Sequence, residues 1–424
     1  MLLHTKENMT SIVGVLNKRA VAIAADSAVT VGDTHKVMNT GNKIFSLSKY
    51  APVGIAIYGS ASMMDTPWEV IIKCYRRELK ARKFLYLKEY VDDFMHYLRR
   101  HEFFASVEVQ RKNLTIQILL FLNACEEKAK KRANYTANPT QAVVDELNAC
   151  KTANMANIDV FSEFQNYGYA DFLLYARNEI QIVLSQSKTP NIAQHFNELA
   201  ESYYYYMRVA NIDRSGDSGL VFVGYGEEEI YPCLYNIVIN LYYDQRLQFR
   251  KGEQVEIRNE LPSASIVPFA QVEATQTVIR GINPSFYNII SNNLNTALTA
   301  FRTASSNFAR QNNAQALATQ IDNIDVSALT QTFTKSAQNE FFEKYTRPLV
   351  NTISLLSISD MANVAESLVA LTSLVNRMSP REESVGGPVD VAVISKGDGF
   401  IWIKRKHYFD PVLNTQFFNN YNND

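Results

Sequence analysis

Cysteine, glycine and proline are all scarce in this chain of 424 residues. The four cysteines, Cys74, Cys125, Cys150 and Cys233, lie far apart in the sequence and form no CxxC pair. This spacing argues against a disulfide framework or a cysteine zinc site and fits reduced thiols in a cytosolic protein. With 16 glycines and 12 prolines, the chain is neither collagen-like nor dominated by linkers.

An excess of charge is also missing. Lysine and arginine total 42 and aspartate and glutamate 43, so the net charge is −1. Binding to nucleic acid is therefore not indicated. The first nine residues lack an apolar signal core, and the longest apolar stretches, such as 116–122, are too short to span a bilayer. We expect a soluble, cytoplasmic protein that binds no membrane.

Common cofactor motifs are absent. The sequence contains no GxxxxGK[ST] loop and no HExxH, and its six histidines show no ligand spacing, so no metal or organic cofactor is expected. Gly216-Asp217-Ser218-Gly219 imitates the nucleophile segment of trypsin-like proteases, but Leu220 follows it and no early histidine has a matching context. We interpret this segment as a turn before a strand over 220–225.

Apolar residues are abundant in the chain. Hydrophobic residues make up 46% of the chain and charged residues 20%, which favours a large packed core in one to three domains. Apolar, β-rich runs predict strands over 10–16, 20–25, 43–47 and 53–58. Helical spacing then predicts a helix capped by Asp65, with Pro67 in its first turn, and a second helix over 87–98.

The rest of the chain continues this mixture. Helices are predicted over 108–132, 139–152, 170–186, 190–211, 270–278 and 361–378. Strands are predicted over 220–225, 235–243 and 254–257, and a final hairpin over 389–403. Residues 291–336 are rich in Asn, Ala, Thr, Ser and Gln, and form either polar helices or a partly disordered insertion. The order of elements predicts an α+β domain that carries helical insertions.

The chemistry-bearing residues cluster between Thr10 and Gly59. Asp26 ends one apolar strand, Lys43 begins the next, and Gly59 follows a third. A carboxylate beside an ammonium at the ends of strands serves structure more often than catalysis. The residues alone therefore leave a structural ion pair and a catalytic pair both open.

The spacing of these residues resembles the proteasome β-subunit branch of the N-terminal nucleophile (Ntn) hydrolases. The similar segments are Thr10-Ser11-Ile12-Val13-Gly14-Val15, Ala24-Ala25-Asp26-Ser27-Ala28-Val29-Thr30, Asn42-Lys43-Ile44-Phe45 and Tyr58-Gly59-Ser60. Thr10 is followed after 16 residues by Asp26 and after 20 by Thr30, as in the family, while Lys43 comes one residue later than the family spacing. The resemblance extends over 10–102, 219–284 and 355–408, about half of the chain.

The resemblance implies a fold and a division of the chain. The fold would be a four-layer α/β/β/α sandwich with two antiparallel sheets between helix layers and a large helical insertion. Residues 1–9 would be an N-terminal extension or propeptide. The Ntn-like domain would comprise 10–102, 216–290 and 341–424, interrupted by a helical insertion at 103–215 and a polar helical insertion at 291–340.

The resemblance also implies a mechanism. Thr10 would carry the nucleophilic hydroxyl, and its own α-amine, with an ordinary pKa of about 7.7–8.0, would serve as the base. A nearby Lys43 cation would lower the pKa of that amine further, and Asp26 would hold Lys43 in place. The backbone N–H of Gly59 would face the developing oxyanion.

Substrate-binding and supporting residues follow from the same resemblance. Thr30 would bind the substrate backbone as an added strand. A mainly apolar side-chain pocket would be bordered by Ala28, Gly41, Phe45 and Ala61. Glu382 stands at the family's supporting aspartate position, and Ser384 lies one residue from its supporting serine position, which holds Val385.

One part of the family pattern is replaced. Val272-Glu273-Ala274 stand where the family has a Gly-Ser-Gly turn before its third helix. Nine residues also precede Thr10, so its amine must be exposed, either by self-cleavage at Met9–Thr10 or by a start at Met9 and removal of that methionine. A chain that keeps Met1 would have a blocked amine and be a pseudoenzyme.

The leading hypothesis is a threonine-type peptidase or amidase that forms an acyl-enzyme on Thr10. Its substrate would be a peptide or protein, and its partners copies of itself, since the family builds rings. The alternative is a catalytically inactive Ntn-fold scaffold or regulator that binds partners through its helical insertion. A third hypothesis is an amidase for a small non-peptide amide.

Overall fold

The computed structural model describes residues 10–31, 36–38, 41–100, 105–214, 216–260, 262–379, 386–407 and 409–416. These residues form two compact units. The described parts of Asn42–Glu256 and Ile394–Ile401 make up unit 1; those of Thr10–Gly41, Ile257–Val393 and 402–416 make up unit 2. The chain is a mixed α/β protein with antiparallel sheets, as the sequence predicts.

Unit 1 is built on a five-stranded antiparallel sheet. Its strand order is β11-β10-β9-β6-β5. The strands are β5 (Ile44–Ser46), β6 (Val53–Gly59), β9 (Ser218–Gly224), β10 (Cys233–Tyr243) and β11 (Arg246–Glu256). A small ladder, β7 (Ser62–Met63) with β8 (Thr66–Pro67), follows β6. All residues of β9 and β10 are buried, which explains their continuous apolar runs.

Aromatic side chains join the sheet of unit 1 to two helices, α1 (Trp68–Leu79) and α2 (Leu87–Arg100). The ring of Phe94 lies 5.5 Å from that of Phe222 on β9 and 4.9 Å from that of Tyr75, both edge to face. Trp68, at the start of α1, is fully buried. These large rings supply much of the buried apolar area that holds α1 and α2 on the sheet.

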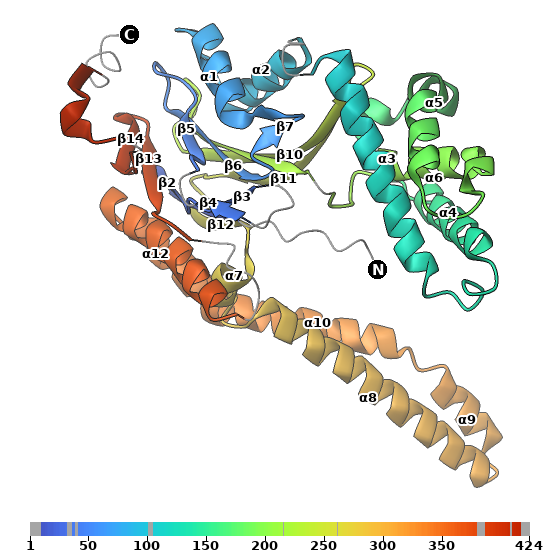
Figure 1. Cartoon of the computed structure of the whole chain (residues 1–424). Helices are drawn as coiled ribbons and strands as arrows, with labels where there is room; N and C mark the ends of the chain where they lie inside the picture. Colours follow the sequence, from blue (N-terminus) through green and yellow to red (C-terminus); the bar gives the residue numbers. More distant parts are fainter. Residues whose placement is uncertain are drawn as a thin grey trace. The chain divides into compact units, whose positions relative to one another are not determined.

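Four more helices of unit 1 pack on one another. They are α3 (Val107–Ala129), α4 (Pro139–Met155), α5 (Tyr169–Gln186) and α6 (Phe196–Arg208), with 3₁₀ turns at Ser162–Phe164 and Ile192–Gln194. Helix α3 contacts α4, α5 and strand β10, and α6 contacts α4 and α5 (Figure 1). The four-tyrosine run 203–206 lies in α6, where Tyr203 and Tyr204 are buried against Phe172 of α5.

Arg214 fixes the chain after α6. Its guanidinium donates to the carbonyls of Tyr206, Val209 and Ile212 at 2.8, 2.5 and 3.1 Å. The group lies between the rings of Phe161 and Tyr206, 5.1 and 5.0 Å from their centroids, and Arg214 is only 7% exposed.

Arg214→Ala is expected to lower the free energy of unfolding by about 3–5 kcal/mol, because it strips buried carbonyls of their donor and opens a cavity. Chemical denaturation followed by circular dichroism measures the loss. Arg77→Ala, at an exposed position of α1, is the matched control and should change the value by no more than about 0.5 kcal/mol. Equal effects of the two changes would contradict the role given to Arg214.

Unit 2 contains the second five-stranded sheet, ordered β12-β1-β2-β13-β14. Its strands are β1 (Ser11–Asn17), β2 (Ala20–Ala25), β12 (Ala264–Ala270), β13 (Asp390–Ser395) and β14 (Gly399–Lys404), of which 394–401 fall in unit 1. Strand β1 pairs antiparallel with β2 and β12. A two-stranded ladder, β3 (Val29–Val31) with β4 (Lys36–Met38), follows β2.

Helices α7 (Glu273–Arg280), α11 (Arg347–Leu355) and α12 (Ile358–Arg377) lie beside the second sheet. Helix α12 runs along β1 and β2 (Figure 1). Among the described helices, only α12 is long and apolar enough to cross a membrane. Its buried residues Met361, Ala365 and Val369 share a core with Val13 and Ala22, which is the packing of an amphipathic core helix.

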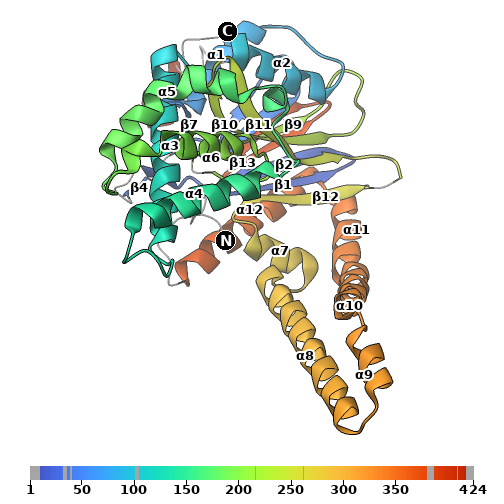
Figure 2. The ribbon, with the colours of Figure 1, turned by 90° about the vertical axis from the view of Figure 1, so that its right-hand side faces the viewer.

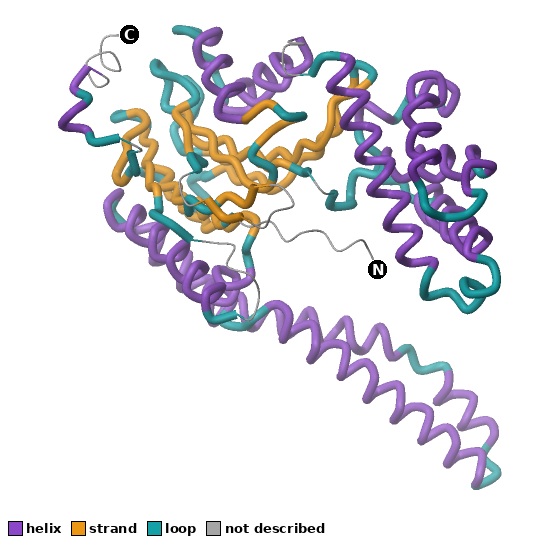
Figure 3. Tube along the Cα trace, viewed as in Figure 1, coloured by secondary structure: helices purple, strands orange, loops and turns teal. Residues whose placement is uncertain are grey.

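A long helical arm follows α7 in unit 2. It consists of α8 (Pro284–Gln311), α9 (Gln315–Asp322) and α10 (Val326–Phe341), and a π-helical turn (Phe342–Thr346) joins it to α11. Helix α8 runs beside α9 and α10, and the arm contains only helices and short turns (Figures 2 and 3). Tyr287 of α8 donates to the carbonyl of Thr334 in α10 at 2.9 Å. Of the two predictions for 291–336, the helical one is confirmed.

Several predictions need correction. Asp65 does not cap a helix: α1 begins at Trp68 after Pro67, and the Asp65 carboxylate accepts from Lys112 at 2.7 Å. The helix predicted over 190–211 is shorter than expected. His195, which is not helical, separates the 3₁₀ turn Ile192–Gln194 from α6. Strand β11 begins at Arg246 rather than at residue 254, and β12 was not predicted. The helix expected from residue 270 begins at Glu273.

Candidate active site

Thr10 lies immediately before β1 in unit 2. Its carbonyl accepts a hydrogen bond from the Gln271 backbone N–H at 3.1 Å, and the next residue, Ser11, pairs with Ala270. Ala270 has a φ of +64°, a left-handed conformation that is costly for a residue with a side chain. Thr10 is 5% exposed. Pairing with β12 thus fixes the backbone of Thr10 at the end of a strand.

The Asp26 carboxylate organises the backbone around that strand end. It accepts from the N–H of Ser11 at 2.9 Å, of Ala28 at 3.2 Å and of Gly386 at 3.3 Å. The N–H of Asp26 in turn donates to the Ser11 carbonyl at 3.1 Å, and Asp26 is 1% exposed. One buried carboxylate therefore connects the beginning of β1, the turn after β2 and the segment before β13. The sequence predicts that Asp26 holds Lys43, and that pairing stays a prediction. The backbone bonds of Asp26 were not anticipated.

Ser27 extends this set of contacts. Its N–H donates to the Gly386 carbonyl at 3.1 Å, and its hydroxyl donates to the Pro388 carbonyl at 2.5 Å. The contacts of Ser27 with Gly386 and Pro388 were not anticipated from the sequence. A signal was available, because Gly386-Gly387-Pro388 is a tight turn next to a strand, but nothing in the sequence pairs that turn with Ser27.

Three predicted substrate-binding residues lie in the same stretch of unit 2. Ala28 is buried, and Thr30 is on β3, opposite Val37 of β4. The N–H of Gly41 donates to the Ser27 carbonyl at 3.1 Å. A Cβ at Gly41 would lie 2.3 Å from a methyl carbon of Val29, so only glycine fits there without a shift. Unit 2 thus contains five of the predicted site residues, Thr10, Asp26, Ala28, Thr30 and Gly41. They lie at one end of its sheet and in or next to the β3–β4 hairpin.

The other predicted site residues belong to unit 1. Lys43 is 3% exposed, and its carbonyl accepts from the Ile57 N–H at 2.8 Å. Phe45 is a buried residue of β5 opposite Ile55. Gly59 ends β6 opposite Ser218 with a φ of +78°, which favours glycine. Ala61 is exposed, and its carbonyl accepts from the Trp68 N–H at 3.0 Å.

Two predicted supporting residues, Glu382 and Ser384, lie outside the described residues. Their predicted roles therefore stay predictions. Ser218, the serine of the protease-like motif, is the first residue of β9, where its hydroxyl donates to the Ser60 carbonyl at 3.1 Å. Ser218 therefore has a structural role at the junction of β6 and β9.

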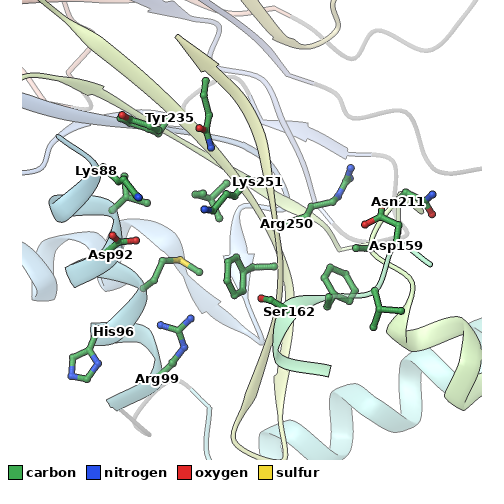
Figure 4. A pocket seen from close by; sticks show the side chains of 18 of the residues that line it. Lys88, Asp92, His96, Arg99, Asp159, Ser162, Asn211, Tyr235, Arg250 and Lys251 are labelled. Atoms are coloured by element: carbon green, nitrogen blue, oxygen red, sulfur yellow. The ribbon is translucent and has the colours of Figure 1, made fainter. Parts of the chain in front are cut away.

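A cavity of about 930 Å³ in unit 1 was not anticipated from the sequence (Figure 4). It is lined by α2, the loop over 159–162, residues 210–211 and strands β10 and β11. Lys88, Arg99 and Lys251 line it together with Asp92 and Asp159, so neither sign of charge dominates. The Arg99 guanidinium is itself paired with Glu163 at 2.6 Å. The lining residues come from five separate segments, and no motif connects them in the sequence.

The part of the chain that the structure describes holds no group of three or more His, Cys, Asp or Glu side chains placed to bind a metal ion. The chemistry available at Thr10 and Asp26 is that of a hydroxyl, a carboxylate and backbone N–H groups. This donor set suits the activation and positioning of a nucleophile.

Comparisons with known proteins give one set of matches. No family model matches this chain, and no curated protein does. Anbu from Hyphomicrobium sp. strain MC1 aligns at 9% identity and a TM-score of 0.30, over 98% of this chain and 97% of that one. A Gly-1 mutant of the same protein aligns at 8% and 0.28, over 97% and 95%. Anbu from Yersinia bercovieri, described as an ancestral beta-subunit, aligns at 9% and 0.27, over 97% and 94%.

These TM-scores are too low to carry an argument about fold or function. The case for a function therefore rests on the residues of this chain and their contacts.

Proposed function

We propose that this protein is a threonine-type peptidase or amidase of the N-terminal nucleophile class, with Thr10 as its nucleophile. The observation that carries the proposal is the buried Asp26 carboxylate, which accepts the N–H of Ser11 and so holds the residue next to Thr10. The sequence spacing of Thr10, Asp26, Thr30, Lys43 and Gly59 supports it. A nucleophile needs such fixed positioning, because small misplacements are costly in rate.

In the proposed reaction the Thr10 hydroxyl attacks the substrate carbonyl, and the α-amine of Thr10 takes the hydroxyl proton. The backbone N–H of Gly59 stabilises the oxyanion, and Lys43 lowers the pKa of the amine. The amine then protonates the leaving nitrogen as the C–N bond breaks. Water hydrolyses the resulting ester on Thr10, which releases the carboxylic acid and restores the free hydroxyl.

We also propose how the sheets, insertions and copies of the chain are arranged. The two antiparallel sheets would stack between helix layers as a four-layer sandwich, with 103–215 and 291–340 as insertions and 1–9 as a segment that is removed. Copies of the chain would associate, with a ring as one form, and the protein would act on peptides in the cytoplasm. A small non-peptide amide is the other substrate class, and parallel assays of both classes separate them.

The decisive test is the N-terminus of the purified protein. Intact mass and N-terminal sequencing are expected to show a chain that begins at Thr10, because only a free α-amine can act as the base. A peptide β-lactone or epoxyketone should then label Thr10, and a mass shift on its peptide measures the adduct. A chain that begins at Met1 and takes up no probe would contradict the proposal.

A non-catalytic scaffold is the second candidate, and the surface of the helical arm favours it. Phe286, Ile290, Phe301 and Phe308 are exposed on α8 at intervals that repeat along one helical face. An exposed apolar face of this kind is typical of a surface that binds another protein. Under this candidate the protein keeps Met1, and Phe301→Asp with Phe308→Asp changes its sedimentation rate while leaving it folded.

A further inference from the structure

Two cysteines that are 25 positions apart in the sequence meet between α3 and α4 of unit 1. The Sγ atoms of Cys125 and Cys150 are 4.0 Å apart. Cys125 is 2% exposed and belongs to the apolar core, whereas Cys150 is half-buried at its edge. One sulfur is therefore shielded by its surroundings, and the other can be reached from solvent.

The charges around this pair are predominantly positive. Lys128 and Arg132, from the end of α3 and the turn after it, lie near Cys150, and Glu146 of α4 is the carboxylate nearby. Glu146 is already paired with both cations, at 3.9 Å from Lys128 and 2.8 Å from Arg132. From α6, Tyr206 faces the two sulfurs, and burial raises its pKa, so it stays a neutral phenol.

This setting separates the two thiols chemically. The hydrogen bond from Cys125 lowers the pKa of Cys150 to about 7, with a further contribution from Lys128. The same hydrogen bond and burial raise the pKa of Cys125 well above its ordinary value. Near neutral pH, a large share of Cys150 is therefore thiolate while Cys125 stays a thiol, and thiolates are the reactive form of cysteine.

We propose that Cys125 and Cys150 form a redox-active dithiol, which a hydroperoxide converts to an intramolecular disulfide. The inference is independent of the proposed hydrolase function, because neither cysteine is among the residues placed at the candidate active site. It also differs from the expectation of four isolated reduced thiols, which the sequence spacing suggested.

The reaction takes two steps, and Cys150 is the residue that is oxidised first. The Cys150 thiolate attacks one oxygen of hydrogen peroxide, an S–O bond forms, the O–O bond breaks, and hydroxide leaves and is protonated to water. The Cys125 sulfur then attacks the sulfenic sulfur, the S–S bond forms, and the S–O bond breaks. The Cys125 proton leaves with that oxygen as a second water. The two thiols thereby give two electrons to the peroxide.

The geometry needs only a small movement. A disulfide has sulfurs about 2.05 Å apart, so the observed separation must close by about 2 Å. Both cysteines lie within two turns of a helix end, Cys125 near Ala129 and Cys150 near Met155, where backbone adjustment is easiest. The other cysteines provide internal controls: Cys74 is on α1, and Cys233 on β10 donates to the Glu229 carboxylate at 3.3 Å.

The test is oxidation of the full-length protein with a small excess of hydrogen peroxide. The protein is then unfolded in denaturant without reductant, the remaining thiols are alkylated, and the peptides of a digest are identified by mass spectrometry. We expect a cross-linked peptide that joins Cys125 to Cys150, the loss of two of four alkylable thiols, and full recovery with dithiothreitol. Without oxidant, the rate of alkylation at Cys150 should rise with pH and reach half its maximum near pH 7.

Two variants make the order of events testable. In Cys125→Ser, a dimedone adduct should accumulate on Cys150, because no second thiol resolves the sulfenic acid. In Cys150→Ser, Cys125 should remain alkylable after oxidation. The proposal fails if all four thiols of the unaltered protein stay alkylable, if Cys150 proceeds to the sulfinic acid while Cys125 stays free, or if Cys74 or Cys233 takes part in the disulfide. These readings on the unaltered protein do not depend on whether either variant folds.

Discussion

Thr10→Ala is expected to abolish amide hydrolysis, with a loss on the order of 10³-fold or more in kcat/KM. The methyl group of alanine cannot form an acyl-enzyme, and the hydroxyl of the next residue, Ser11, has no free α-amine of its own to act as the base. The fold should be unchanged, because the contact that anchors residue 10 is made by its backbone carbonyl with Gln271. Peptide hydrolysis and covalent labelling by a β-lactone measure the loss.

The control must separate catalysis from processing. Each variant is therefore produced from a start codon placed directly before residue 10, so that exposure of the amine does not depend on self-cleavage. Thr10→Ser should keep measurable turnover and labelling, because its hydroxyl remains. Thr277→Ala, which removes a half-buried hydroxyl on α7 that donates to the Glu273 carbonyl, should have no effect. Undiminished turnover in Thr10→Ala would remove Thr10 from the role of nucleophile.

Asp26→Ala is expected to cause the largest loss of stability among changes near the site. Three buried N–H groups, those of Ser11, Ala28 and Gly386, would lose their acceptor. Each unsatisfied donor costs about 1–3 kcal/mol, and water that enters the space reduces the sum, so we expect a loss of about 3–6 kcal/mol. Urea denaturation followed by circular dichroism measures it.

Asp26→Asn tests whether the three hydrogen bonds to the carboxylate account for the loss of stability. An amide oxygen in the place of Oδ2 can still accept from Ala28 and Gly386, whereas the amide nitrogen would face the N–H of Ser11. One bond is lost instead of three, so the loss of stability should be about 1–3 kcal/mol. Asp92→Ala, at an exposed position of α2, is the matched control and should stay within about 0.5 kcal/mol. Equal stability of Asp26→Ala and this control would show that the three bonds contribute little.

The sequence predicted the strongly patterned elements well and two of the edge strands poorly. Strands β1, β2 and β6 and helices α2 and α12 were anticipated because buried strands and amphipathic helices have strong apolar patterns. Strands β11 and β12 are the edge strands of their sheets. The exposed run 251–254 of β11 is polar, and β12 contains Pro268, both of which an edge strand tolerates.

The candidate site could be predicted only in part for a related reason. The positions of Thr10 and Asp26 at strand ends follow from local apolar runs. That the Asp26 carboxylate also accepts from Gly386 does not, because the two residues are 360 positions apart. The cavity between α2, β10 and β11 likewise draws its residues from distant segments, and no local pattern marks it.

The sequence by itself determined the strands and helices that have strong apolar patterns, and which residue types stand at the ends of β1, β2 and β6. These features depend on periodicity and on neighbours within a few positions, which any window of sequence contains. Only the tertiary structure decided which N–H groups surround Asp26 and that Cys125 lies against Cys150. Such contacts depend on how separate helices and strands pack, and sequence spacing carries no measure of that distance.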